Sequence, residues 1–138
     1  MGMDFLIQKP DGTREYVTMM GYGSFGDISH VGRMAGLDMD EYDRITDYSG
    51  LDEEWVIPPE DVQKILLFYR KLLDLVEELD RKGIVLLTET EEQRRHRELK
   101  GFATTPRDRW NGVISRLHRL IDLCEKVIKV RGSIVMVL

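Results

Sequence analysis

The stretch from Pro58 to Gly83 constrains the fold of this chain more than any other part of the sequence. Pro59 suits the first position of a helix, where its missing N–H has no helical partner, and Gly83 suits a left-handed C-terminal cap. Between them, apolar residues recur at alternating steps of three and four, which places them on one helical stripe. The members of this stripe are Val62, Ile65, Tyr69, Leu72, Val76 and Leu79. Further leucines widen the stripe, so we predict a core helix that is covered on two sides.

A second long helix is predicted from Thr105-Pro106 to Gly132. Its apolar stripe includes Trp110, Leu117 and Cys124, and it matches the first helix in length. We therefore expect the two helices to pack together, and we expect Cys124 to be a buried, inert thiol.

The remaining patterns predict strands and short helices. Residues 3–8 and 13–20 read as a β-hairpin, because Lys9-Pro10-Asp11-Gly12 between them is in turn-favouring order. Apolar stretches at 84–88 and 133–138 predict further strands. Short helices are expected over 27–36, 38–47 and 88–100, with Asp38 and Glu41 forming a capping box and residues 48–58 irregular. The expected fold is a single α+β domain, 1–138, with an N-terminal hairpin plus one or two further short strands packed on two long antiparallel helices.

The sequence contains no membrane or secretion signal. No apolar stretch approaches the roughly 20 residues that span a bilayer, and the N-terminus lacks a basic region followed by a long apolar one. A single cysteine excludes an intramolecular disulfide framework. The cytoplasm is therefore the expected compartment.

Charge is unevenly distributed along the chain. The net charge is −5, but residues 1–80 carry 7 basic and 18 acidic side chains, whereas residues 81–138 carry 13 basic and 7 acidic ones. Either the two halves pack together and neutralise each other, or one of them presents a charged face to a partner.

One candidate contact for a protein partner is the acidic segment Asp52, Glu53 and Glu54 followed by Trp55. Tryptophan beside carboxylates is suited to anchoring a basic partner, since Trp is a common interface hot spot. The alternative is that Trp55 and Ile57 fold over the start of the central helix.

A second candidate is the Gly-rich segment Gly21-Tyr22-Gly23-Ser24-Phe25-Gly26, which resembles the G-x-G-x-x-G loops of nucleotide-binding proteins. The context of those families is missing, because the preceding strand belongs to a hairpin and the next lysine is Lys64. We read the segment as a turned loop before a helix at residue 27. Its alternative role is to bind a small molecule or phosphate through Gly21, Gly23, Ser24 and Gly26.

No catalytic, metal or cofactor motif is recognisable. His30 is isolated, Asp38, Asp40 and Asp43 lack the spacing of a calcium loop, and His118 is not placed to activate Cys124. The basic cluster at 94–100 is interleaved with glutamates, and the acidic total disfavours nucleic acid.

The leading hypothesis is therefore a small non-enzymatic protein-binding module, of inhibitor or immunity type, with an acidic surface and no cofactor. A homodimer through the apolar helices is the alternative if one domain does not cover the stripe of residues 62–79.

Overall fold

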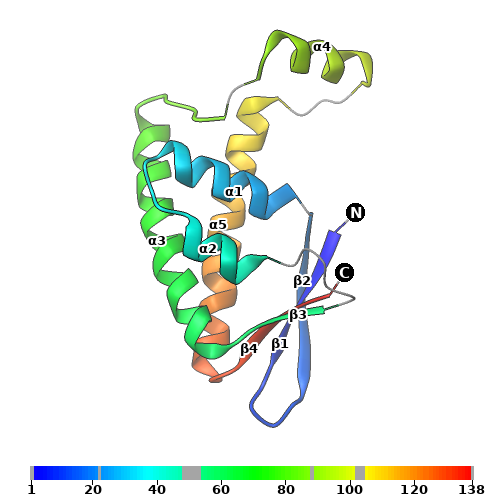
Figure 1. The fold of residues 1–138 in the computed structure, drawn as a ribbon, viewed down its shortest axis with the longest axis vertical. Helices are drawn as coiled ribbons and strands as arrows, with labels where there is room; N and C mark the ends of the chain where they lie inside the picture. Colours follow the sequence, from blue (N-terminus) through cyan, green and yellow to red (C-terminus); the bar gives the residue numbers. More distant parts are fainter. Residues whose placement is uncertain (1, 22, 48–53, 88, 102–104, 138) are drawn as a thin grey trace.

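The computed structural model describes residues 2–21, 23–47, 54–87, 89–101 and 105–137. In these residues an α+β fold is formed by an antiparallel sheet and helices packed on it (Figure 1). The strands are β1 (Gly2–Gln8), β2 (Arg14–Gly21), β3 (Glu54–Ile57) and β4 (Ser133–Val137), in the order β2-β1-β4-β3. The helices are α1 (Gly23–Met34), α2 (Asp40–Thr46), α3 (Pro59–Arg81), α4 (Glu91–Leu99) and α5 (Pro106–Lys129). The predicted fold class is confirmed.

The hairpin of β1 and β2 forms around the predicted turn. Gly12 has a positive φ of 89°, and its N–H donates to the carbonyl of Lys9 over 2.9 Å. The register shifts between Phe5, which faces Thr18, and Leu6, which faces Tyr16, so Val17 is an extra residue on β2. This bulge explains why the apolar residues of the hairpin do not alternate cleanly in the sequence.

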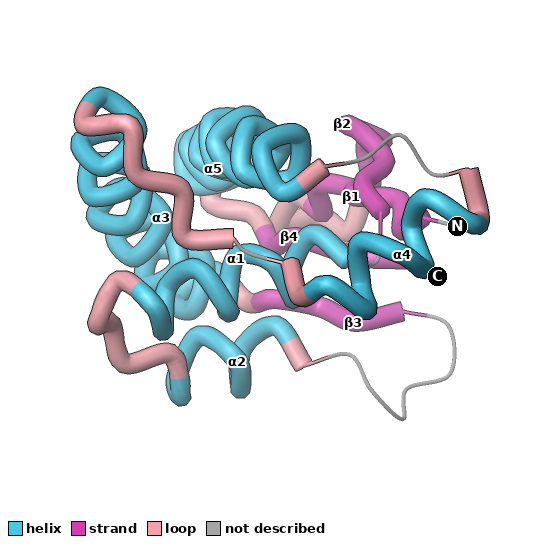
Figure 2. Tube along the Cα trace, turned by 90° about the horizontal axis from the view of Figure 1, so that it is seen from above, coloured by secondary structure: helices cyan, strands magenta, loops and turns pink. Residues whose placement is uncertain are grey.

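Helices α3 and α5 run antiparallel on one side of the sheet (Figure 2). Contacts along their length show the direction: Asp80 accepts from Arg107, Glu77 contacts His118, and Arg70 donates to Glu125. The sheet turns a row of buried side chains toward these helices, namely Met3, Phe5, Ile7, Ile134 and Met136. Of the side chains that alternate with this row, Tyr16, Met19 and Val56 are exposed, whereas Val135 in the middle of β4 is buried.

The broad apolar stripe of α3 is covered within one chain. Its buried members are Val62, Ile65, Leu66, Tyr69, Leu72, Leu73 and Val76. Leu67 is 67% exposed and lies outside the buried stripe. The predicted homodimer through these helices stays a prediction, and the buried stripe itself does not require it.

Two predictions about strands are wrong. Residues 84–87 do not form a strand; Leu87 is buried and Val85 and Leu86 pack partly against the core, while the chain crosses from α3 to α4. Residues 54–57, expected to be irregular, form β3 at the edge of the sheet. A short apolar stretch can be buried either as a strand of a sheet or as a connecting segment that crosses the core. Its sequence pattern alone therefore does not distinguish the two.

Two predicted helix starts also differ. Helix α1 begins at Gly23 and not at residue 27, and α2 begins at Asp40 without a side-chain cap. Asp38 accepts a hydrogen bond from the Asp40 N–H over 3.0 Å, so the predicted box with Glu41 does not form. Met39 is instead buried against Gly32, whose absent Cβ would lie 2.4 Å from the Met39 sulfur. Gly32 therefore permits the close approach of this segment to α1.

The predicted start of the second long helix at Thr105 is confirmed, and α4 begins after Thr90 in the same way. Each threonine accepts from the backbone N–H three residues later, and the side chain there, Gln93 or Asp108, accepts in return from the threonine N–H. None of the helices in the described ranges is both long and apolar enough to cross a bilayer.

Candidate functional site

The predicted partner contact at Asp52–Trp55 is only partly described. Asp52 and Glu53 lie outside the described residues, while Glu54 begins β3 and is exposed. Its two carboxylate oxygens accept hydrogen bonds from Arg14 of β2, over 2.8 and 3.0 Å. This bidentate partner holds the pKa of Glu54 below its usual value. The charge of Glu54 is therefore compensated within the chain.

Trp55 is half-buried and packs against the core. Its indole Nε1 donates a hydrogen bond of 2.8 Å to the carbonyl of Ile45, near the end of α2. This contact fastens β3 to α2, so Trp55 has a structural role. A contact between Trp55 and a protein partner stays a prediction.

The Gly-rich segment is not a loop of its own. Gly21 ends β2 and Gly23 begins α1, so strand and helix follow each other with only residue 22 between them. Gly26 lies inside α1 and has no positive φ, and the side chain of Ser24 lies outside the described part. The loop was predicted because glycine readily adopts a positive φ, but the segment forms the first turn of α1, and Phe25 and Ile28 are buried.

An open cleft of about 750 Å³ lies between α1 and α2. From α1 it is lined by residues that recur along one helical face, namely Phe25, Gly26, Ser29, His30 and Arg33. From α2 and the residue after it, the cleft is lined by Asp43, Arg44, Thr46 and Asp47. Of the predicted ligand-binding residues, Gly26 is thus placed in the wall of a cleft. We call this feature the α1–α2 cleft.

Three side chains form a closed polar network in the α1–α2 cleft. The Ser29 hydroxyl, which is 8% exposed, donates to Asp43 Oδ1 over 2.8 Å, and Arg33 Nη1 donates to Ser29 Oγ over 2.6 Å. Arg33 Nη2 also pairs with Asp43 Oδ2. Ser29 and Arg33 stand one turn apart on α1, and Asp43 reaches them from α2. The network therefore joins the two helices and fixes the position of the Arg33 guanidinium.

This arrangement suits binding better than catalysis. A serine nucleophile needs a base that takes its proton, but Ser29 is flanked by Asp43, which also pairs with Arg33, and by a guanidinium, which stays protonated. His30 is exposed and has no recorded hydrogen bond to Ser29 within the described residues. Nothing in this network activates the hydroxyl.

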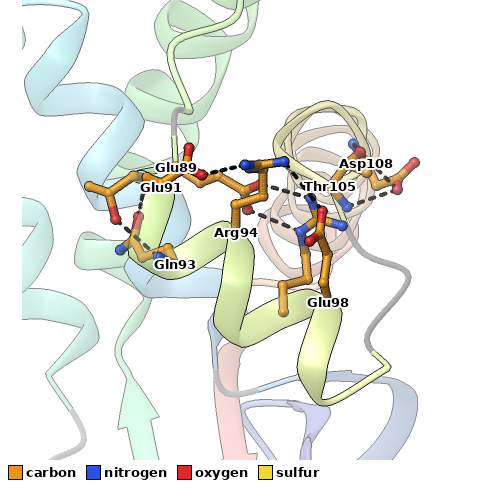
Figure 3. A network of polar contacts seen from close by, with 9 residues as sticks. Glu89, Glu91, Gln93, Arg94, Glu98, Thr105 and Asp108 are labelled. Atoms are coloured by element: carbon orange, nitrogen blue, oxygen red, sulfur yellow. Dashed lines mark hydrogen bonds and ion pairs between the residues drawn. The ribbon is translucent and has the colours of Figure 1, made fainter.

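A second polar cluster lies around the start of α4 and the start of α5 (Figure 3). Arg97 donates two hydrogen bonds to Glu89, over 2.8 and 3.1 Å, and Arg94 pairs with Glu91 and lies 3.6 Å from Glu98. The Arg97 guanidinium lowers the pKa of Glu89. These pairs show that the basic cluster at 94–100 is largely neutralised by its own glutamates.

Arginines of α5 are paired as well. Arg107 donates to Asp80 over 2.9 Å, and Arg109 donates to Asp27 of α1 over 2.6 Å. These carboxylates would compete with a phosphate for Arg107 and Arg109, while the expectation that nucleic acid is not the partner stays a prediction.

Cys124 and His118 do not form a reactive pair. Cys124 is fully buried, and burial raises the pKa of its thiol to about 12. His118 is exposed and lies 3.1 Å from Glu77 of α3. The prediction of a buried Cys124 is confirmed, and its raised pKa makes the thiol unreactive. Among the described residues, no three His, Cys, Asp or Glu side chains gather as metal ligands.

Comparison of the chain with protein-family models, with curated proteins and with solved structures gave no match. The sequence analysis did not single out Arg33, and it considered Asp43 for a calcium loop without connecting it to Ser29. The signal that points to them is the Ser29–Arg33 spacing of one helical turn, but the partner on α2 depends on how the two helices pack.

Proposed function

We propose that this chain is a small cytosolic, non-enzymatic protein-binding module of the inhibitor or immunity type, which occupies a basic surface of its partner. One observation carries the proposal: residues 38–61, called here the acidic segment, contain ten acidic side chains and one basic one, Arg44. A surface of one charge accelerates association with an oppositely charged partner and makes that association sensitive to salt.

The described part of the acidic segment comprises α2, β3 and the first turn of α3, and α2 and β3 lie along the same side of the molecule (Figure 2). Asp40 and Glu60 are exposed and have no ion pair among the described residues. Lys64 lies 3.2 Å from Glu41 and 3.9 Å from Asp61, and so compensates part of the charge. The remaining excess of carboxylates supports an acidic contact surface.

We propose the exposed carboxylates of α2 and α3 as the main contact, in preference to Trp55. Since Glu54 pairs with Arg14 and the Trp55 indole bonds to Ile45, the exposed carboxylates of α2 and α3 are better placed to meet a partner. Asp52 and Glu53 stay candidate members of the same surface on their sequence alone.

The experiment is capture from a lysate of the native host, at low and at high salt, followed by mass spectrometry. The test variant is Asp40→Lys with Glu60→Lys, and the matched control is Asp74→Lys with Asp122→Lys, which makes the same charge change at exposed sites on α3 and α5. We expect one basic protein to bind the wild type and the control, to be lost with the test variant and to be released by high salt.

Charge reversal in the first turn of two helices opposes their dipoles, so both proteins need matching circular dichroism spectra and melting curves. The neutral variant Asp40→Asn with Glu60→Gln is the milder companion, with partial loss expected. Capture of the same basic protein by the test variant, unchanged in amount and salt dependence, rules the acidic surface out.

The alternative prediction, small-molecule or phosphate binding through Gly21–Gly26, concerns another part of the molecule. Of that segment, Gly26 lines the α1–α2 cleft, whose other wall is formed by residues 43–47 of the acidic segment.

A further inference from the structure

The side chains that line the α1–α2 cleft differ in how far they already interact with the rest of the protein. Both oxygens of Asp43 already accept, one from Ser29 and one from Arg33. The Thr46 hydroxyl donates to the carbonyl of Tyr42 over 2.9 Å, and Asp47 also interacts within the protein. The carboxylates that line the cleft therefore already interact with groups of the protein itself.

The hydrogen-bond donors of the cleft, in contrast, are only partly used within the protein. A guanidinium carries five N–H groups, and the network with Ser29 and Asp43 uses two of those of Arg33. Arg44 makes no hydrogen bond to any described residue; its nearest recorded carboxylate is Glu41, at 3.7 Å. His30, on the same wall as Arg33, likewise has no recorded hydrogen bond in the described part of the chain.

Room for the rest of a ligand exists beside these donors. A Cβ added at Gly26 would meet no other atom within 4 Å, so the helix surface is open at this point of the wall. Phe25, next to it, adds an apolar residue to the lining. An apolar group thus fits at the Gly26 end while a charged group meets the arginines.

We propose that the α1–α2 cleft binds a small organic oxyanion, a carboxylate or a phosphate monoester. The oxyanion accepts hydrogen bonds from Arg33 on α1 and from Arg44 on α2, with His30 as a third donor, and the organic part lies against Gly26 and Phe25. Arginine is the side chain that matches the planar, two-oxygen geometry of both groups. The Ser29–Asp43 pair holds Arg33 in place before the ligand arrives, which reduces the entropy lost on binding.

The test is a nuclear magnetic resonance titration of the full chain with phenyl phosphate and with benzoate at constant ionic strength. Benzylammonium, which has the same ring and the opposite charge, is the control ligand. We expect saturable shifts in the amides of residues 25–33 and 43–47 with one or both anions at millimolar concentration, and none with benzylammonium. Comparison of the two anions tells a phosphate site from a carboxylate site.

Two variants locate the site. Arg44→Gln removes a charge-assisted donor and is expected to weaken anion binding about tenfold or more. Gly26→Leu places a side chain in the open space without a clash and is expected to block the organic part, while its helical φ tolerates the change. Arg70→Gln is the matched control, since Arg70 is an exposed arginine on α3 whose partner is Glu125.

Equal affinity of the wild type and Arg44→Gln, shifts outside the cleft, or no saturation with either anion would overturn the proposal. The tests of the two proposals stay distinguishable, although Arg44 belongs both to the acidic segment and to the cleft. Arg44→Gln removes the only basic residue of that segment, so it should leave capture of a basic partner intact or strengthen it, whereas Asp40→Lys with Glu60→Lys should leave anion binding in place.

Discussion

Helices α4 and α5 begin in the same way and end in different environments. Each starts with a threonine capping box, at Thr90 and at Thr105. In α5 seven side chains are buried, among them Trp110, Leu117 and Cys124, whereas in α4 none is. In Figure 1 α4 projects beyond the rest of the molecule, while α5 runs through its centre.

The difference between α4 and α5 shows that a sequence carries two kinds of information about a helix, namely where it begins and whether it joins the core. Capping residues and neighbouring charges decide where a helix begins, because they satisfy backbone groups that are local to it. An apolar stripe decides whether the helix becomes part of the core, because burial of that stripe supplies most of its stability. Helix α4 has the first kind of signal alone, and besides its capping box, ion pairs join Arg94, Arg95 and Arg97 to nearby glutamates.

The largest difference in stability is expected between the truncation of a core leucine and the truncation of an exposed one. Leu72 of α3 is fully buried and Leu99 of α4 is 87% exposed. Leu72→Ala should lower the free energy of unfolding by about 2–5 kcal/mol, and Leu99→Ala by less than about 0.5 kcal/mol. Denaturant melts of the two variants measure the contrast. A loss below about 0.5 kcal/mol for Leu72→Ala would show that the position is not part of the core.

The same distinction explains how much of the fold the sequence predicts. The hairpin, α3, α5 and β4 carry strong local patterns, and the structure has all of them near the expected bounds. The sequence predicted a strand at 84–87 and an irregular segment at 54–57, but the structure has the reverse. An apolar stretch such as residues 84–87 becomes a strand only if a neighbouring strand has a free edge. Which edge is free depends on β4, far along the chain, and no local pattern records it.

The α1–α2 cleft was hidden for a related reason. Gly26 and Ser29 were visible in the sequence, but Asp43 reaches Ser29 across 14 positions, through the packing of Met39 on Gly32. The acidic character of residues 38–61 needed no such knowledge, since it is a property of composition. The charge of a surface can therefore be predicted from the sequence alone, whereas a site built from two helices requires knowledge of how the helices pack.

A smaller effect is expected at the contact between the ends of α3 and α5. Asp80 accepts hydrogen bonds from the Trp110 indole over 3.0 Å and from Arg107 over 2.9 Å. Asp80→Ala leaves the N–H of a fully buried tryptophan without this acceptor, so we expect a loss of about 1–3 kcal/mol in denaturant melts. Asp80→Asn keeps an oxygen acceptor and should lose less. Equal losses in the two variants would assign the effect to the charge and not to the indole hydrogen bond.

The two capping boxes test the comparison of α4 and α5 directly. Thr105→Ala should cost about 1 kcal/mol of global stability, because α5 unfolds only with the core. Thr90→Ala removes the same kind of cap, but α4 opens without the core, so the global free energy of unfolding should stay within about 0.5 kcal/mol of the wild type. Faster hydrogen exchange confined to the amides of residues 91–99 is the expected result for Thr90→Ala. Equal losses of global stability would mean that α4 folds as one unit with α5.

The smallest effect concerns pH and the pair of Glu89 with Arg97. Because Arg97 lowers the pKa of Glu89 in the folded chain, the pair stabilises α4 at any pH above the usual glutamate value. That contribution is lost as the pH falls through the lowered pKa. The pKa values of Glu54 and Asp108 are lowered too, so acid weakens the rest of the molecule at the same time and a single melting curve does not isolate Glu89.

The informative quantity is the difference between the wild type and Glu89→Gln, read from amide chemical shifts of residues 91–99 between about pH 6 and about pH 3. The wild type should hold more helix in α4 at the upper end, and the two proteins should converge at the lower end. A difference that does not change with pH would show that packing of the Glu89 side chain, and not its charge, secures the start of α4.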